Sequence, residues 1–344
     1  MTNEIHSETL YRKYRPENFD QVIGQNEVVT ILKNQITSGS VAHAYLFSGG
    51  RGTGKTSIAR IFANELGTDS QDIYEIDAAS NRGINEIREV RDGVANRPFA
   101  SQYKVYIIDE VHMLTKEAFN ALLKTLEEPP AHIIFILATT EKHKVLDTIL
   151  SRCQTYEFKL GNISHLKELV EKTAAAEKRK IDDSAVLYIA QRGNGSFRDT
   201  LSFLQKVLAS IEGEVTYTDI ERVFGATDGT REIDLLEALS NKDSKKLFEI
   251  YHDAIEQKVN IGQLLEGLLT YTRKVLLLRY EVQYKNLALE EMTEQTVERL
   301  SSFSGITSHV LKGLLETTQL IGQTSRPEES LEVFLYEQCA KWEK

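Results

Sequence analysis

Cysteine is scarce in this chain of 344 residues, which contains only Cys153 and Cys339. Two cysteines support neither a disulfide framework nor a cysteine-based zinc site, so we expect a reducing cytoplasm and no zinc. The eight histidines show no paired spacing of metal ligands either. Metal binding through cysteine or histidine therefore has no support in the sequence.

Long apolar runs are also missing. No stretch approaches the ~20 residues that a membrane-spanning helix needs, and the chain does not open with an apolar segment. We therefore expect no membrane partner. With 41% hydrophobic and 27% charged residues, the composition is ordinary for a soluble globular protein, and the length allows two or three domains.

Positive charge is in deficit, because 41 lysines and arginines face 51 acidic residues and leave a formal net charge of −10. This balance argues against a protein that coats nucleic acid through bulk positive potential. It leaves room for a local DNA-binding surface. A helix expected to start near Gly83 carries Arg88 and Arg91, which could follow a phosphate backbone. A solvated charged helix is an equal alternative.

Glycine gathers in one stretch, and we expect the fold to be organised around it. Gly49 is followed after four residues by Gly54-Lys55-Thr56, which matches the P-loop pattern. Glycines allow positive φ, so successive N–H groups can turn towards a phosphate, and the following helix adds its positive end. The candidate phosphate-binding residues are Gly49, Gly50, Arg51, Gly52, Thr53, Gly54, Lys55, Thr56 and Ser57.

Two acidic residues supply the second half of this chemistry. Lys55 would reach the β- and γ-phosphates of ATP, and the Thr56 hydroxyl would hold Mg²⁺. Asp109 and Glu110 directly follow a buried-strand pattern. Two acids after a strand are a weak signal alone, but with an upstream P-loop they match the Walker B arrangement. Asp109 would then complete the Mg²⁺ shell, and Glu110 would act as general base on the attacking water.

Strand and helix patterns alternate through the first half of the chain. The expected strands are Ala44 to Phe47, Ile73 to Ile76, Lys104 to Ile108, Ile133 to Ala138 and Thr155 to Phe158. A helix from Lys116 to Glu128 would be capped by Thr115 or its neighbour. The segment from Tyr11 to Pro16 is expected to be extended, because Arg15 precedes a proline. The alternation predicts an α/β fold with a parallel sheet covered on both faces, and nucleotide at its carboxyl edge.

From about Asn162 the strand signals largely stop. Three helical patterns between Leu166 and Val207 predict a small helical domain, followed by a helix from Tyr217 to Phe224. An Asp228-Gly229 turn is expected to open a last, helical region. Its leucine stripes are typical of an internal core, with an oligomer interface as the alternative. The predicted domains are residues 1–161, 162–227 and 228–344.

Together these motifs resemble the gamma/tau subunits of the bacterial DNA polymerase III clamp loader, which are AAA+ ATPases. The resemblance covers the first 225 residues densely, whereas the last region is similar only in length and helical character. The resembling stretches are Tyr11–Gln25, Ala42–Ser57, Glu75–Ile87, Val105–Leu114, Ala118–Pro130, Leu137–Thr140, Ser151–Cys153 and Gly195–Leu201. The resemblance implies an AAA+ P-loop domain, a helical lid and an all-α collar domain.

The resemblance also implies roles for single residues. The adenine and ribose pocket would be lined by Tyr11, Arg15, Pro16, Val22 and Ile23. Thr139 would be sensor 1, with Thr140 as the adjacent candidate, and Arg198 would be sensor 2 on its own subunit's phosphate. Arg152 would be the arginine finger, donated to the neighbouring subunit's ATP. A guanidinium suits this task because it is always charged and presents forked donors.

Partners follow from the same resemblance. Copies of the subunit would assemble with delta and delta-prime subunits, and ATP binding would let the assembly open the beta sliding clamp. Primer-template DNA would then trigger hydrolysis and clamp closure. We expect a cytoplasmic location at the bacterial nucleoid and replisome. The family counts as part of a DNA polymerase, but no polymerase active site is recognisable in this chain.

One departure from the family pattern concerns zinc. The usual gamma/tau subunit carries a four-cysteine zinc module after the P-loop helix, whereas here a connection without cysteine, Gly67 to Asp72, takes its place. Zinc is therefore not implied, and the cofactors expected are ATP and Mg²⁺. The tail that binds polymerase and helicase in the long tau form is not in this sequence, so we expect a gamma-like form or a shortened chain.

The sequence leaves three alternatives open. Without the zinc module, the outline approaches the small subunits of replication factor C. A nucleotide-silent subunit such as delta-prime is disfavoured by the intact P-loop and acidic pair. A DNA-translocating AAA+ motor, such as a branch-migration helicase, would usually carry a winged DNA-binding module. The helical stripes after Gly229 argue against such a module.

Overall fold

The computed structural model describes residues 8–81, 83–224, 229–280, 292, 294–321, 324 and 326–342, with only the backbone of residues 84–86 and 221. The chain divides into two compact units, Met1–Tyr217 and Thr218–Lys344. The finer division at residues 161 and 227 stays a prediction. Asp228, the first residue of the expected turn, lies outside the described residues.

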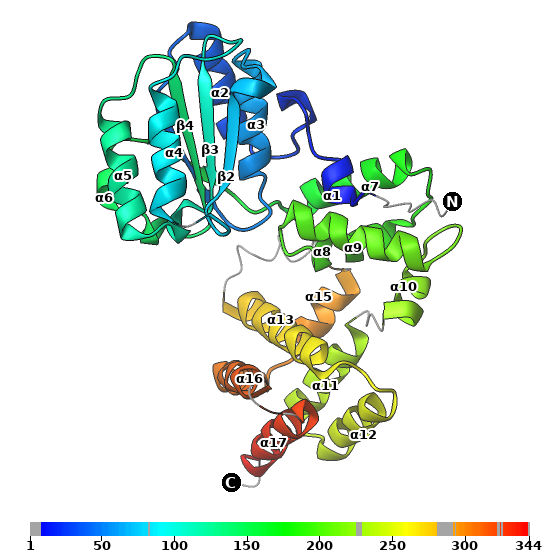
Figure 1. The fold of residues 1–344 in the computed structure, drawn as a ribbon. Helices are drawn as coiled ribbons and strands as arrows, with labels where there is room; N and C mark the ends of the chain where they lie inside the picture. The colour runs from blue at the N-terminus through cyan, green and yellow to red at the C-terminus, as the bar shows by residue number, and fades with distance from the viewer. Residues whose placement is uncertain are drawn as a thin grey trace, which may run out of the picture. The chain divides into compact units, whose positions relative to one another are not determined.

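A parallel sheet forms the centre of the first unit (Figure 1). Its strands are β1 (Ala44–Gly49), β2 (Ile73–Asp77), β3 (Lys104–Asp109), β4 (Ile133–Thr139) and β5 (Gln154–Phe158). They lie in the order β2-β3-β4-β1-β5, and all neighbouring pairs are parallel. All five expected strands are present, so the predicted α/β fold with a parallel sheet is confirmed.

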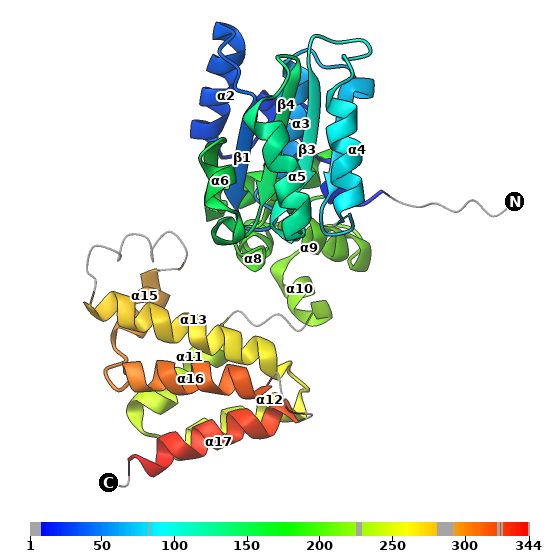
Figure 2. The same ribbon diagram turned by 60° about the vertical axis from the view of Figure 1, so that its left-hand side comes forward.

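Helices cover both faces of the sheet (Figures 1 and 2). One face carries α2 (Asn26–Ser38) and α3 (Lys55–Glu65), and the other carries α4 (Ile84–Val94), α5 (Lys116–Glu127) and α6 (Asp147–Leu150). Successive side chains of a strand point to opposite faces. In β4, Phe135 and Leu137 therefore pack on the side of α5, and Ile134 and Ile136 pack on the side of α3. This double burial explains the continuous apolar run of the strand.

The helix α5 follows its sequence signals closely. The Thr115 hydroxyl oxygen accepts the N–H of Ala118 at 3.3 Å and so caps the first turn, as expected. The helix ends at Glu127, shortly before two prolines. Proline cannot continue a helix, and it also disfavours the helical conformation in the residue before it.

The start of the chain corrects an expectation. Tyr11 to Pro16 was expected to be extended, but α1 (Leu10–Lys13) forms one helical turn. Proline restricts mainly the residue before it, Arg15, so a turn that ends at Lys13 remains allowed. Contacts from a distant helix stabilise this turn, because Leu10 is buried and its N–H donates to Gln205 Oε1 at 3.0 Å.

A small group of helices completes the first unit. It consists of α7 (Ile163–Ala176), α8 (Asp183–Arg192) and α9 (Phe197–Ser210), and α10 (Tyr217–Phe224) follows. Asn162, Asp182 and Ser196 each accept the backbone N–H three residues further on, which caps the three helices. The helical patterns predicted for this region are confirmed.

All elements described in the second unit are helices. They are α10 from Thr218 onward, α11 (Thr230–Asn241), α12 (Ser244–Glu256), α13 (Ile261–Tyr280), α15 (Glu294–Ser301), α16 (Ser308–Ile321) and α17 (Pro327–Ala340). The leucine stripes form their shared core, with Leu235, Leu264 and Leu314 fully buried. Leu315 is an exception, since it is 52% exposed. Nowhere in the described chain is a helix both long and apolar enough to cross a membrane.

Candidate nucleotide-binding site

Three motifs from distant parts of the sequence meet at one edge of the sheet. The strand order places β4 between β1 and β3, so their carboxyl ends are neighbours. The P-loop follows β1, the acidic pair Asp109-Glu110 follows β3, and Thr139 ends β4 opposite Ser48. Ligands of open α/β sheets bind at this edge.

Several glycines of the P-loop have a positive φ. Gly52 and Gly54 have φ values of 73° and 95°, which side chains rarely allow. Gly52 is also enclosed, because a Cβ there would lie 2.1 Å from Ser196 Oγ. Its carbonyl accepts the backbone N–H of Phe197 at 3.0 Å. The loop is thereby joined directly to the first turn of α9.

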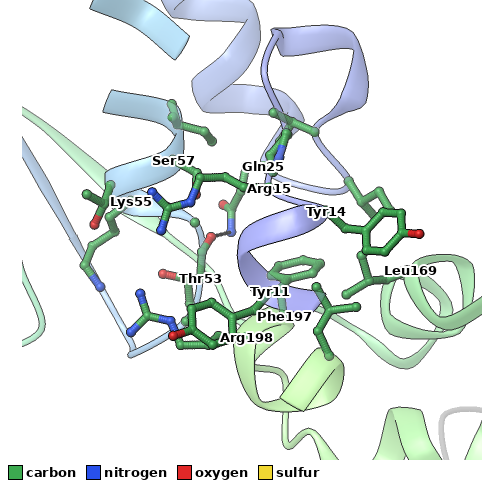
Figure 3. A pocket seen from close by; sticks show the side chains of 18 of the residues that line it. Tyr11, Tyr14, Arg15, Gln25, Thr53, Lys55, Ser57, Leu169, Phe197 and Arg198 are labelled. Carbon is green, nitrogen blue, oxygen red and sulfur yellow. Dashed lines mark hydrogen bonds between the residues drawn. The ribbon is translucent and has the colours of Figure 1, made fainter. Parts of the chain in front are cut away.

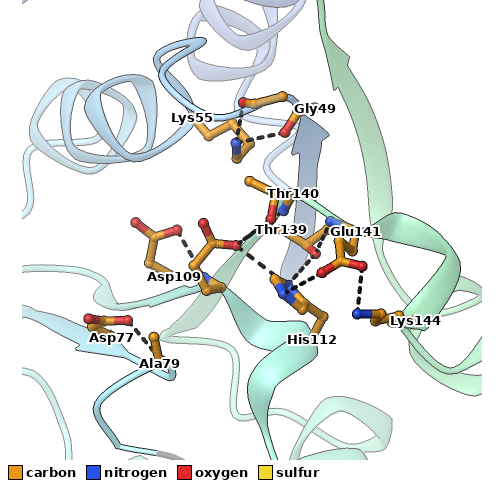
Figure 4. Close-up of polar contacts among 12 residues, drawn as sticks. Gly49, Lys55, Asp77, Ala79, Asp109, His112, Thr139, Thr140, Glu141 and Lys144 are labelled. Atoms are coloured by element: carbon orange, nitrogen blue, oxygen red, sulfur yellow. Dashed lines mark hydrogen bonds and ion pairs between the residues drawn. The ribbon is translucent and has the colours of Figure 1, made fainter. Parts of the chain in front are cut away.

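Lys55 is buried at the start of α3, with 6% of its surface exposed. Its Nζ donates to the carbonyls of Gly49 and Gly50, at 2.8 Å each (Figure 4). Burial lowers the pKa of Lys55, while the charges of Glu110 and Asp109 act in the opposite direction. The lysine is thus held on the loop, where a phosphate could replace the two carbonyls.

Thr56 and Asp109 provide oxygen ligands for a cation. The Thr56 hydroxyl donates to Asp109 Oδ2 at 2.6 Å. A hydroxyl and a carboxylate are the hard oxygen donors that Mg²⁺ prefers, and phosphate oxygens and water usually complete its shell. In the part of the chain that the structure describes, no three or more His, Cys, Asp or Glu side chains form a metal site. The pair therefore fits Mg²⁺ that arrives with a nucleotide.

Glu110 has an unusual backbone and a well-held carboxylate. Its φ of 48° lies in the left-handed region, which is uncommon outside glycine. Its Oε2 accepts the N–H and the hydroxyl of Thr140, at 3.2 and 2.9 Å. Thr139 Oγ1 instead accepts the N–H of Glu141 and lies 3.0 Å from a ring nitrogen of His112. The two adjacent threonines therefore make different contacts.

A pocket lies above these groups, between the P-loop, the start of the chain and helices α7 and α9 (Figure 3). The candidate residues that it brings together are Tyr11, Arg15, Pro16, Val22, Ile23, Arg51, Gly52, Thr53, Gly54, Lys55, Thr56, Ser57, Asp109, Glu110 and Arg198. Four candidates do not line it, namely Gly49, Gly50, Thr139 and Arg152. Gly49 and Gly50 still contact Lys55.

Seven residues of this pocket were not predicted from the sequence, namely Tyr14, Gln21, Gln25, Ile58, Leu169, Phe197 and Leu201. Leu169, Phe197 and Leu201 lie on helices whose apolar periodicity suggested only a core. Gln25 connects the P-loop to the segment after β5, because its Nε2 donates to the carbonyls of Thr53 and Lys159, at 3.3 and 2.6 Å. Its place at the end of a resembling stretch was the one available signal.

Positive charge accumulates in the pocket. Among the described residues, Arg15 and Arg198 form no ion pair. Burial, reinforced by the nearby Arg60, lowers the pKa of Arg15. The Arg198 guanidinium lies 5.7 Å from the centre of the Tyr11 ring. Cations without carboxylate partners in a partly closed pocket favour a polyanionic ligand.

Arg152 lies away from the pocket, directly after α6. Its guanidinium donates to Glu127 Oε1 at 2.7 Å and to the carbonyl of Thr148 at 2.6 Å. Its side chain is 32% exposed. Arg152 therefore does not line the candidate pocket of its own chain, and a role on a neighbouring subunit stays a prediction.

The fold and the P-loop define the class of protein, which is that of AAA+ nucleotide-binding proteins. Solved structures of RuvB from Thermotoga maritima are similar to this chain. A point mutant of RuvB has a TM-score of 0.52 and 23% identity, and the match covers 65% of this chain and 79% of the mutant. The RuvB Holliday junction branch migration motor has a TM-score of 0.51 and 24% identity, over 66% and 79%. At such identities the likeness shows the fold alone.

Sequence relatives identify the family. Residues 24–83 and 68–162 match the family described as DNA polymerase III, delta subunit, and residues 215–340 match DNA polymerase III subunits gamma and tau domain III. DNA polymerase III subunit tau of Bacillus subtilis is 38% identical, over 86% of this chain and 56% of the relative. The gamma/tau subunit of Mycoplasma genitalium is 37% identical, over 90% and 55%. The chain belongs to the gamma/tau family of DNA polymerase III subunits, and it spans about half the length of the curated relatives it matches.

Proposed function

We propose that this chain is an ATPase subunit of a replicative clamp loader. ATP binding and hydrolysis would drive the opening of a sliding clamp and its loading onto primed DNA. The main support is the convergence of Lys55, Thr56, Asp109 and Glu110 at one sheet edge, below a pocket rich in cations. The family gives the setting, since its members carry the name of DNA polymerase III subunits.

ATP would bind with its phosphates on the P-loop N–H groups and the positive end of α3. Lys55 would exchange its two carbonyl partners for phosphate oxygens, which gives a buried ammonium group a charged partner. Arg198 would contact phosphate from the side of α9. The adenine and ribose would lie against Tyr11, Val22 and Ile23.

Hydrolysis would use the acidic pair. Mg²⁺ held by Thr56 and Asp109 would neutralise charge that develops on the β- and γ-phosphates. Glu110 would accept a proton from the attacking water, whose oxygen bonds to the γ-phosphorus as the bond to the bridging oxygen breaks. Thr139 would contact the γ-phosphate as sensor 1. A neighbouring subunit would contribute Arg152.

The proposed assembly contains copies of this chain with delta and delta-prime subunits. Its substrates would be a beta sliding clamp and primer-template DNA, in the cytoplasm at the bacterial replisome. The partly exposed Arg152, bound to Glu127 and a backbone carbonyl, is compatible with donation to a second subunit. Its guanidinium would exchange these partners for phosphate oxygens.

A clamp-loading assay tests this function. The full-length protein is combined with beta clamp, delta and delta-prime, each added in turn, and clamps retained on primed circular DNA are counted with and without ATP. We expect retention only with the complete set and ATP, and none with Lys55→Ala. ATP-dependent branch migration without any need for a clamp would favour a motor instead. Absence of ATP hydrolysis in every mixture would refute the proposal.

A further inference from the structure

His112 contacts the site without belonging to the pocket. It lies in the short helical turn η3 (Val111–Met113), directly after Glu110, and its side chain is 5% exposed. Its Nδ1 is 3.0 Å from Thr139 Oγ1 and 3.4 Å from Glu110 Oε2. Its Nε2 faces the other way, 3.4 Å from Glu141 Oε1 (Figure 4). Each ring nitrogen therefore faces a carboxylate.

The outer side of this ring is firmly held. Glu141 forms an ion pair with Lys144 at 2.6 Å, and its backbone N–H donates to Thr139 Oγ1 at 3.0 Å. The hydrogen bond from Lys144 lowers the pKa of Glu141, and the nearby His112 and His143 lower it further. Glu141 is therefore a fixed negative charge on the solvent side of the imidazole.

The inner side of the ring reaches the candidate base. The oxygen of Glu110 that faces Nδ1 is the one that accepts both bonds from Thr140. Its other oxygen has no described partner and remains available to water. The His112 ring thus contacts two residues at once: Glu110, which follows β3, and Thr139, which ends β4.

We infer that His112 is a positioning residue for hydrolysis, which fixes the Glu110 carboxylate relative to Thr139. The group that activates water and the group that contacts the γ-phosphate then keep one relative placement. The inference rests on the proposed function, since it has meaning only if Glu110 and Thr139 act on ATP. Nδ1 carries the role, because Nε2 faces only Glu141. His112 does not line the pocket, so ATP affinity should not depend on it.

Asparagine and glutamine at this position separate the two ring nitrogens. Asparagine places an amide near the site of Nδ1, and glutamine places one near the site of Nε2. In the full-length chain, His112→Ala should lower kcat roughly 10- to 100-fold, because small displacements of a catalytic group cost about this much. His112→Asn should retain most of the kcat, and His112→Gln should fall to the level of His112→Ala.

Two further readouts make the result specific. The Kd for ATP should stay within about twofold of wild type in all three variants, as expected for a group that acts only on the transition state. His143→Ala is the matched control, because this neighbouring histidine is 75% exposed and also faces Glu141. It should leave kcat unchanged. Thermal unfolding confirms that each variant is folded.

Several outcomes would overturn the inference. Equal kcat values for folded His112→Asn and His112→Gln would do so, as would a change confined to ATP affinity. If His112→Ala does not fold, the Asn and Gln pair decides alone. A wild-type chain without ATPase activity would refute the proposed function itself. Only the role of His112 would be refuted if the wild type is active, Glu110→Gln is inactive and His112→Gln is fully active.

Discussion

At the scale of single residues, we expect the largest effect on ATP binding and hydrolysis from a change of Lys55. It is buried against two backbone carbonyls, and no other lysine of the described chain lines the pocket. Lys55→Ala should abolish hydrolysis and weaken ATP binding by roughly 100-fold or more, since a charged hydrogen bond contributes about 1.5–3 kcal/mol and a phosphate would lose several. Nucleotide titration and phosphate release measure both effects. If the variant binds ATP with wild-type affinity, Lys55 does not contribute to ATP binding.

A change of Glu110 should affect hydrolysis but not ATP binding, in contrast to a change of Lys55. Glu110→Gln keeps an oxygen that can accept the two bonds from Thr140 but loses the basic carboxylate. The variant should bind ATP with Mg²⁺ normally and hydrolyse it roughly 100-fold or more slowly, the usual contribution of a general base. Steady-state turnover and ATP affinity are compared in the same preparation. Unchanged turnover would exclude Glu110 as the base.

The sequence indicated the chemistry of the site but not its side-chain partners. The spacing of the P-loop and of the acidic pair is set by the binding of phosphate and Mg²⁺. The sequence alone therefore identified Lys55, Thr56, Asp109 and Glu110. Which threonine holds Glu110 depends on how the end of β4 faces the end of β3, and adjacent residues in sequence give no signal of that. The contact between His112 and Thr139 also joins residues from the ends of different strands, 27 positions apart, so no signal of it is visible in the sequence.

At the scale of elements, the central strands β1, β3 and β4 could be predicted because burial on both faces leaves a continuous apolar run. The edge strands β2 and β5 are partly exposed and have a weaker pattern. Strand order could not be predicted, since it depends on which strands pair across long connections. α1 shows the limit most clearly. Its single turn is stabilised by Gln205, about two hundred residues away, and local preferences around Pro16 point to extended backbone instead.

The short connection before β2 is fixed by one buried carboxylate. Asp72 is fully buried and accepts the backbone N–H groups of Phe99, Ala100 and Ser101, at 2.6, 2.8 and 2.9 Å. Burial alone raises the pKa of Asp72, but these N–H groups and the Ser101 hydroxyl together outweigh it, so the pKa is lowered. The carboxylate ties η2 (Ser70–Asp72) to the loop that precedes β3.

Asp72→Asn should lower the free energy of unfolding at pH 7 by about 1–3 kcal/mol, because the amide leaves buried N–H groups unsatisfied. A lowered pKa in the folded state means that the ionised form stabilises the fold above the ordinary value of 3.8, and that this is lost as pH falls below it. The difference between wild type and variant in urea unfolding should therefore shrink below pH 3.8. Asp69→Asn, which keeps a capping oxygen, is the control. A difference independent of pH would contradict the prediction.

At the scale of the whole molecule, Arg152 tests whether subunits complete one another's sites. Arg152→Ala should bind ATP nearly normally, because Arg152 does not line its own pocket. In the assembled complex it should hydrolyse ATP roughly 10³–10⁵-fold more slowly, the usual contribution of an arginine finger. Glu127→Ala, which removes the carboxylate partner of Arg152 but leaves the guanidinium in place, should retain hydrolysis.

Mixed assemblies make the test decisive. Lys55→Ala subunits lack a working P-loop but keep Arg152, and Arg152→Ala subunits have the opposite defect. Where the first lies beside the second, one complete site should form, so ATPase activity should partly recover on mixing. Co-assembled mixtures that contain both variants and remain inactive would show that Arg152 does not act between subunits.

DNA contact can be tested on α4. Arg88 is exposed, with no ion pair described for it, whereas Arg91 is already bound to Asp92 at 2.8 Å. Arg88→Ala should reduce the salt dependence of DNA-stimulated ATPase by about one unit of slope, as expected for one lost phosphate contact. Arg91→Ala should have a smaller effect. An unaltered slope in both would indicate an ordinary solvated helix.

The hydrogen bond between the Gly52 carbonyl and the Phe197 N–H has a consequence for timing. It attaches the P-loop to the helix that also carries Arg198, so this helix cannot withdraw without disturbing the loop around the phosphates. If the chain hydrolyses ATP as proposed, release of ADP would require this bond to the P-loop to break, so ADP release and withdrawal of α9 would be coupled. The subunit would be reset for its next ATP at the rate at which α9 and the helices packed on it leave the loop, however fast the chemical step is.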